Sequence, residues 1–275
     1  MQNFAVLSRP RRLWTPLSKR ARSRSLQGLV RFMILAASLL LPTRPLFADD
    51  PQYAGRPLTA WVNDLGDLDG RVRLRAVVRL AKLGAPAVPM LERALDSSSK
   101  DQRLWALTVL GMLTPIPTDV LERALSKSDP EIRLRAAQYL SRHDRATPAA
   151  IKTLTESLSS SAVSAQLAAL TALSQTKAKP PNLTSAVAPL LSSSNPDVRR
   201  MSALVLSTLT SEQSAAGKAL LTRLPSETDS AVTLQIIESI GAIGYRDARP
   251  SFERMKPASP DAIRAAIDSA LDRMK

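Results

Sequence analysis

The 275-residue sequence contains no cysteine, one histidine and nine glycines, and aromatic residues make up only 4% of it. Without cysteine the chain forms no disulfide, so packing alone must stabilise the folded part, and we expect no lipoprotein anchor. One histidine and no cysteine argue against a zinc site of the ordinary ligand types. The glycines are not clustered, so we expect no nucleotide-binding glycine loop. Few aromatic residues beside abundant Leu, Ala and Val favour helix-on-helix packing over a sheet.

The formal net charge of +14 is concentrated at one end of the chain. Nine of the 38 Lys and Arg residues, and none of the 24 Asp and Glu residues, lie within residues 1–48, which leaves 29 basic against 24 acidic side chains in the remainder. A block of like charge at one terminus is typical of an address or a tail. The basic excess is therefore not a property of the fold.

Residues 1–48 have the three parts of a secretory signal peptide. A basic segment precedes the apolar run 33–41, and a small-residue cleavage site ends at Ala48. The run is shorter than the roughly 20 residues that span a bilayer. We predict cleavage after Ala48 and export to the periplasm or the extracellular space, with membrane contact only through an uncleaved leader. An organellar transit peptide, a twin-arginine signal at Arg11 and Arg12, and a retained signal anchor are the alternatives.

A nine-residue phrase returns along the rest of the chain. It begins as VRLRAVVRL at Val72–Leu80 and returns as QRLWALTVL, IRLRAAQYL, AQLAALTAL, VRRMSALVL and, more faintly, VTLQIIESI. The equivalent central residues are Ala76, Ala106, Ala136, Ala169, Ser202 and Ile236. They are 30, 30, 33, 33 and 34 residues apart. A period in that range is the sequence signature of a solenoid.

Each unit is predicted to hold two helices. In the first unit, Asp69 caps a helix whose apolar face includes Val72, Ala76 and Leu80, and a turn beginning at Gly84 leads into a second helix. Seven residues before the central positions stand Asp69, Ser99, Asp129, Ala162, Asn195 and Asp229, of which five are N-cap residues. Three residues before them stand Arg73, Arg103, Arg133, Gln166, Arg199 and Thr233. Amphipathicity alone does not produce matching caps and matching arginines, so the repeat is real.

The remaining second helices and the two ends follow from the same alignment. Second helices are expected at about residues 118–125, 148–158, 183–191, 214–224 and 248–255. Residues 57–65 form a lone N-terminal helix, in which Trp61 closes the open core, and residues 49–56 form a short linker. A last helix ends the chain, with Ala266 or Ile267 as its central residue. A solenoid requires such atypical end units to cover its core.

The DPEIR and NPDVR openings and the LGAPAVPML turn resemble short HEAT repeats of bacterial HEAT-like proteins and phycobilin lyases, over about residues 57–275. The resemblance implies an all-α, right-handed solenoid of about six helix pairs, with first helices on the convex side and second helices on the concave side. It also implies a ladder of Asp and Arg between neighbouring repeats, whose members here are Asp129, Asp229, Arg73, Arg103, Arg133 and Arg199. Because Ala162, Gln166 and Thr233 depart from the pattern, we expect interruptions in the fourth and sixth units.

The sequence predicts no catalytic, metal-binding or cofactor-binding residue. His143 is a lone histidine between two helices, without obvious partners for acid–base work. Glu92 and Glu122 occupy equivalent places in the two LERAL segments, and each is followed by an arginine. That arrangement indicates a solvated helix face. We therefore predict that the protein is not an enzyme.

The predicted function is that of an exported scaffold that binds a protein or peptide on its solenoid surface. The candidate partner contacts are the basic residues of the second helices, Arg93, Arg123, Lys152, Lys218 and Arg223. One alternative is a HEAT-like lyase or isomerase acting on a bound chromophore or cofactor, which requires a deep pocket with convergent polar groups. The other is a nucleic-acid-binding HEAT protein, but aromatic residues for base stacking are few and export would separate it from nucleic acid.

The leader assignment predicts a mature protein that begins at Asp49. Intact-mass and N-terminal peptide measurements on the protein recovered from its native cells should find that terminus. A mature chain that retains residues 1–48 would contradict cleavage, and a terminus elsewhere in the leader would favour one of the alternative targeting routes.

Overall fold

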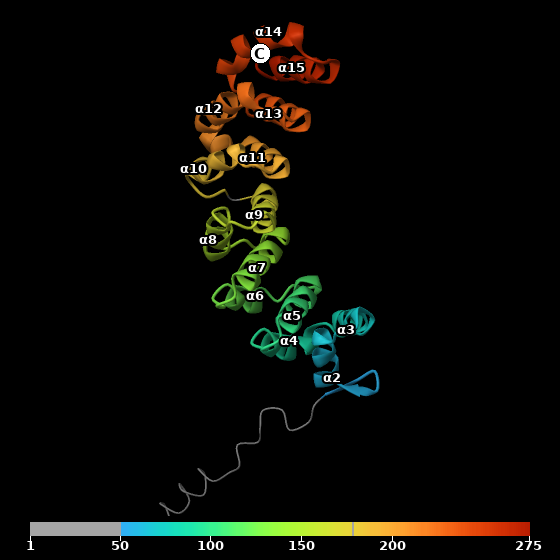
Figure 1. Cartoon of the computed structure of the whole chain (residues 1–275). Helices are drawn as coiled ribbons and strands as arrows, with labels where there is room; N and C mark the ends of the chain where they lie inside the picture. Colours follow the sequence, from blue (N-terminus) through green and yellow to red (C-terminus); the bar gives the residue numbers. More distant parts are fainter. Residues whose placement is uncertain (1–50, 178) are drawn as a thin grey trace, which may run out of the picture. The chain divides into compact units, whose positions relative to one another are not determined.

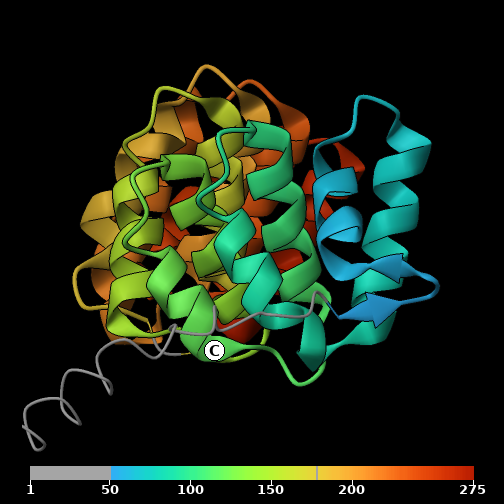
Figure 2. The ribbon, with the colours of Figure 1, turned by 90° about the horizontal axis from the view of Figure 1, so that it is seen from below.

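A computed structural model describes residues 51–177 and 179–275; the predicted leader, residues 1–48, lies outside the described residues. In residues 51–275, helix pairs follow one another in chain order and stack pair upon pair (Figure 1). The view along the stack shows successive pairs overlapping (Figure 2). The predicted all-α solenoid is therefore confirmed.

Six first helices alternate with six second helices. The first helices are α3 (Gly70–Leu83), α5 (Lys100–Met112), α7 (Pro130–Arg142), α9 (Val163–Gln175), α11 (Pro196–Ser207) and α13 (Ser230–Ile243). The second helices are α4 (Val88–Ala94), α6 (Thr118–Ala124), α8 (Pro148–Ser157), α10 (Leu183–Val187) with η3 (Ala188–Ser192), α12 (Gln213–Arg223) and α14 (Arg249–Met255). Further 3-10 turns are η2 (Ala85–Ala87), η4 (Thr210–Glu212), η5 (Leu224–Ser226), η6 (Arg246–Ala248) and η7 (Lys256–Ala258). We number the repeats one to six by their first helices.

The first helices begin where the sequence predicts. Side chains of all five predicted cap residues, Asp69, Ser99, Asp129, Asn195 and Asp229, accept hydrogen bonds from backbone N–H groups of their helices. These bonds satisfy donors that the first helical turn leaves without a partner. Ala162, the sixth residue of the set, provides no side-chain cap for α9. The fourth repeat therefore begins differently from the other five.

The core is built from the repeated apolar positions. All six central residues, from Ala76 to Ile236, have 0% exposure. The same is true of the residues four positions later, which are Leu80, Leu110, Leu140, Leu173, Leu206 and Ile240. Each first helix packs against the next, most extensively α11 with α13 and α13 with α15 (Asp261–Arg273). The apolar face of one pair is thus covered by the following pair.

Both ends carry the expected covering helices. At the N-terminal end, α2 (Leu58–Asn63) and η1 (Asp64–Gly66) precede the first pair, and Trp61 is 5% exposed. At the C-terminal end α15 buries Ile267 fully, which identifies Ile267 and not Ala266 as its central residue. Within residues 49–56, expected to form a short linker, the described part contains β1 (Gln52–Tyr53), which pairs antiparallel with β2 (Arg56–Pro57).

Three contacts hold this strand pair against α2 and η1. The Trp61 indole N–H donates to the Tyr53 carbonyl at 2.8 Å. The Arg56 guanidinium lies 4.4 Å from the centre of the Trp61 ring and forms an ion pair with Asp64 at 2.7 Å. These contacts all lie within residues 53–64, so the strand pair is a local extension of the N-terminal cap.

Two glycines let aromatic rings of the next repeat approach a helix backbone. A Cβ atom at Gly111 would overlap the Tyr139 ring, and one at Gly217 would overlap the Tyr245 ring. Each tyrosine lies 28 residues after its glycine. The space that a side chain at each glycine would occupy is thus filled by a tyrosine ring of the next repeat.

Substituting Gly111→Ala should destabilise the stack, because the added methyl group collides with the Tyr139 ring. Overpacking of this kind typically costs about 1–3 kcal/mol, and we expect a loss of that size in the free energy of unfolding measured by denaturant titration. The control is Gly70→Ala, where the nearest atom to the new Cβ is 3.6 Å away. Equal stability of the two variants would contradict the close packing of α5 against Tyr139.

Candidate functional site

The repeated arginine fixes the loop that precedes its own helix. In Arg73, Arg103, Arg133 and Arg199 the Nη1 group donates to the two carbonyls five and six residues earlier, at distances from 2.6 to 3.2 Å. Gln166 has a related role in the fourth repeat, where its Nε2 group donates to the carbonyls of Leu158 and Ser160. Thr233 reaches only the Asp229 carbonyl. The primary role of the residue at this position is therefore to fix the loop that precedes the first helix of its own repeat.

At two junctions between repeats, the guanidinium group of the repeated arginine also pairs with a carboxylate. Arg103 Nη2 lies 2.9 Å from Asp129 Oδ2, so the second and third repeats are joined by an ion pair. Arg199 is joined to Glu227 by Nε–Oε2 and Nη2–Oε1 contacts of 2.8 and 2.9 Å. Among the described residues, Arg73 and Arg133 contact no carboxylate. The expected ladder thus has two rungs.

The structure does not place Asp229 in the ladder. Both N–H groups at the start of α13, those of Ala231 and Val232, donate to Asp229 Oδ1. Glu227, two residues earlier, takes Arg199 instead, since its longer side chain reaches across the junction. Asp129 fills both roles, because Oδ1 accepts from the Glu131 N–H while Oδ2 faces Arg103.

Glu227 is the most strongly perturbed carboxylate described. Its side chain has 0% exposure. Burial alone would raise its pKa, but hydrogen bonds from Arg199, the Asp229 N–H and Arg223 outweigh that effect and lower the pKa from 4.5 to about 2. Two arginines of the fifth repeat, Arg199 and Arg223, therefore share one buried carboxylate that stays ionised at neutral pH.

The five predicted partner contacts all lie on second helices, but their charges are not equally available. Arg123 pairs with Glu92 at 2.6 Å and with Asp119 at 3.3 Å. Lys152 lies 3.8 Å from Glu156, and Arg223 pairs with Glu227 at 2.9 Å. The Nη1 group of Arg93 lies 4.0 Å from the Met90 sulfur, and the Lys218 side chain is exposed. At least three of the five are thus held by acids of the chain itself.

A cavity of about 490 Å³ lies between α7, α8 and α9. Its lining includes Glu131, Arg133, Leu134 and Arg135 from α7, Glu156 from α8, and Ala162, Ser164, Ala165 and Ala168 at and after the start of α9. Several of these residues are exposed, so the cavity opens to solvent. It lies at the junction where the sequence predicts the first interruption of the ladder.

Small residues of the fourth repeat open this cavity. The positions equivalent to Ala165 hold Val72, Gln102, Ile132, Val198 and Val232. The positions equivalent to Ala168 hold Arg75, Trp105, Arg135, Met201 and Gln235. Two alanines thus stand where every other repeat carries a larger side chain. The repeat alignment contains this signal, but only a comparison of side-chain size would have found it.

Other chemistry is sparse in the described part of the chain. His143 is exposed at the C-terminal end of α7, and no group of three or more His, Asp or Glu residues among residues 51–177 and 179–275 could hold a metal ion. No helix in those ranges has the length and apolar character to cross a bilayer. The cavity and the two charged junctions are the features that remain.

Comparisons with known proteins identify the fold. No protein-family model matches the sequence, and no curated protein matches it. Among solved structures, an engineered protein superposes with a TM-score of 0.51 at 20% identity, over 80% of this chain and 68% of its own. The Escherichia coli protein YibA gives a TM-score of 0.51 at 16% identity, over 78% of this chain and 91% of its own.

A designed armadillo repeat protein solved with the peptide (KR)4 also matches, with a TM-score of 0.43 at 13% identity, over 79% of this chain and 99% of its own. At these identities the likeness concerns the fold alone. The helix pairs, caps and spacing described above, together with the two superpositions at a TM-score of 0.51, define the fold as an all-α solenoid of HEAT-like helix pairs.

Removing the buried carboxylate should destabilise the protein in a pH-dependent way. The folded pKa of Glu227 is lowered, so its contribution is complete above pH 4.5 and is lost as the pH falls towards 2. Glu227→Gln should lower the free energy of unfolding at pH 7 by about 3 kcal/mol, and the difference from the parent should shrink between pH 4.5 and 2. Denaturant titrations across that range provide the measurement.

The matched control is Glu156→Gln, since Glu156 is 64% exposed and lies 3.8 Å from Lys152. It should change stability by less than about 1 kcal/mol at any of these pH values. Parallel stability curves for the Glu227 variant and the parent would contradict the account of the buried pair.

Proposed function

We propose that this protein is an exported, non-catalytic scaffold that binds a protein or peptide ligand on its solenoid surface. The observation that supports this most is the cavity between α7, α8 and α9, which opens to solvent and crosses from one repeat to the next. Leu134 and the alanines of α9 offer apolar surface beside charged and polar groups. That mixture suits a side chain of a peptide ligand better than a buried small molecule.

The charge distribution supports a protein ligand over nucleic acid. A nucleic-acid site requires a continuous stripe of unpaired positive charge. Here Arg123, Lys152 and Arg223 are paired with acids of neighbouring turns or repeats. The described residues also offer no aromatic platform in the cavity. These observations disfavour the nucleic-acid alternative.

The lyase or isomerase alternative requires several polar groups that converge on a reacting atom. In the cavity, Glu131 is already paired with Lys100 at 2.9 Å and with Arg135 at 3.1 Å. The carboxylate most perturbed in the described chain, Glu227, is buried between two arginines at another junction. Neither group is available for proton transfer, so the non-catalytic reading is preferred. Export rests on the leader pattern of residues 1–48, outside the described residues.

Selection from a displayed peptide library against residues 49–275 tests the binding function. We expect recovery of related peptides whose affinity falls at least about tenfold in Ala168→Met, which gives the fourth repeat the side chain that Met201 provides in the fifth. The control is Ala265→Met, at an exposed position of α15. Failure to select any peptide, together with recovery of a tight small-molecule ligand, would overturn the proposal.

A further inference from the structure

The junction between the second and third repeats shows how one carboxylate can satisfy two donors. Asp129 Oδ2 accepts from Arg103 of the preceding repeat at 2.9 Å. Asp129 Oδ1 accepts from the Glu131 N–H in the first turn of α7, also at 2.9 Å. The guanidinium and the helix N-terminus both favour a negative charge at this point. The carboxylate is therefore held on two sides.

The next junction has the same two donors without the carboxylate. Arg133 is fixed by bonds of 2.8 and 2.7 Å to the carbonyls of Lys127 and Ser128, and it contacts no acid among the described residues. Ala162 stands at the position of Asp129 and gives α9 no side-chain cap. The N–H equivalent to that of Glu131 belongs to Ser164. All three residues, Arg133, Ala162 and Ser164, line the 490 Å³ cavity.

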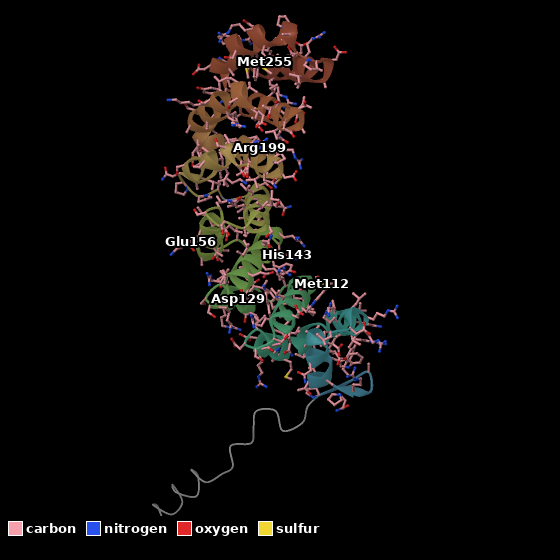
Figure 3. All side chains as sticks on the ribbon, in the orientation of Figure 1. Met112, Asp129, His143, Glu156, Arg199 and Met255 are labelled. Carbon is pink, nitrogen blue, oxygen red and sulfur yellow. The ribbon has the colours of Figure 1, made fainter. Side chains whose placement is uncertain are left out.

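The other charges in the cavity wall are already paired. Glu131 is held by Lys100 and Arg135, and Glu156 lies 3.8 Å from Lys152. The unmet charge is therefore the positive charge of Arg133. Asp129, Glu156 and Arg199 follow one another along the stack, so this cavity lies between the two junctions at which the repeated arginine pairs with an acid (Figure 3).

The first repeat provides an internal contrast. Arg73 also lacks a carboxylate partner in the described residues, but Ser99 caps the next helix by accepting from the Gln102 N–H. One of the two donors is therefore satisfied at that junction. Among the six first helices, α9 is the one that lacks a side-chain cap.

We propose that the cavity is a socket for a carboxylate of a peptide ligand, which occupies the place that Asp129 occupies one repeat earlier. Arg133 donates to one oxygen and the start of α9 donates to the other. Leu134 and the small residues Ala165 and Ala168 leave room for the aliphatic stem of an Asp or Glu side chain. This inference rests on the proposed peptide-binding function and specifies the chemistry that the ligand presents.

Two variants of the chain test the socket directly. Ala162→Asp supplies the carboxylate that Asp129 provides one junction earlier, so it should raise Tm by about 2–4 °C and weaken the binding of an acidic peptide at least about tenfold. Arg133→Gln removes the charge but keeps the loop bonds, as Gln166 does in the fourth repeat. It should weaken the same peptide by a similar factor with little change in Tm. Arg73→Gln, the same change in the first repeat, should leave binding unchanged.

The probes are acetate and three capped or uncapped peptides derived from the library selection. Acetate should shift the NMR signals of the Ser164 amide and the Arg133 side chain in the parent protein but not in Ala162→Asp. A blocked peptide with one Asp is compared with its Asn counterpart, and with the Asn peptide carrying a free C-terminus. Tighter binding of the Asp peptide than of the blocked Asn peptide identifies a side-chain carboxylate as the ligand group. Tighter binding of the Asn peptide with a free C-terminus than of the blocked Asn peptide identifies a terminal carboxylate.

The outcomes separate the socket from the wider function. If selected peptides bind the parent equally well as Asp and Asn forms, or bind Ala162→Asp undiminished, the socket is wrong and the scaffold function stands. If acetate shifts Ser164 and Arg133 but no peptide binds, the socket stands and the peptide-binding function is wrong. If acetate produces no shift at either group, the socket is also wrong.

Discussion

Every part of this structure depends on the stacking of one helix pair on the next. A single pair of helices exposes an apolar face that it cannot bury by itself. Here the central residues, and the Leu or Ile four positions after each of them, have 0% exposure within the stack. Gly111 and Tyr139 show how tight this dependence is, since a ring from one repeat lies where a side chain of the previous repeat would be. Stability and surface shape are thus set at the junctions.

The arginine that recurs in the first helices makes these junctions polar as well as apolar. It is tolerated near the core because three of its donors face fixed acceptors, namely two loop carbonyls and, where one is present, a carboxylate of the next repeat. The guanidinium donors that do not face the loop carbonyls pair with Asp129 in the case of Arg103 and with Glu227 in the case of Arg199. Arg133 lines the solvent-open cavity instead, and in our proposal its remaining guanidinium donors bind the carboxylate of a ligand.

Much of the fold follows from local sequence signals. The cap residues and the central positions were predictable because capping and helical periodicity act over a few residues, and their spacing repeats six times. The strand pair at residues 52–57 was not, because two-residue strands leave no periodic pattern and this pair depends on Trp61. The role of Glu227 was missed because the residue type at its position does not repeat, as Lys127 and Ser193 at the equivalent positions show.

The candidate site illustrates a different limit. Asp229 was a reasonable ladder residue by position, but its Oδ1 caps its own helix and Arg199 pairs with Glu227 instead, a choice of partner that the sequence does not reveal. The cavity forms because Ala162, Ala165 and Ala168 have smaller side chains than the equivalent residues of other repeats. A search for recurring residue types does not detect such a loss of side-chain volume. The predicted interruption at Ala162 was the nearest signal, since it marks the junction where the cavity forms.

The donors of Arg133 and of the start of α9 have no carboxylate or side-chain acceptor among the described residues, unlike their counterparts at Arg103 and α7. Amide hydrogen exchange in the native protein tests this most directly, by comparing the Glu131 and Ser164 N–H groups in one experiment. We expect slower exchange at Glu131, which donates to Asp129 at 2.9 Å, than at Ser164, whose helix has no side-chain cap. Equal protection of the two amides in the free protein would show that Ser164 already has an acceptor and would contradict the account.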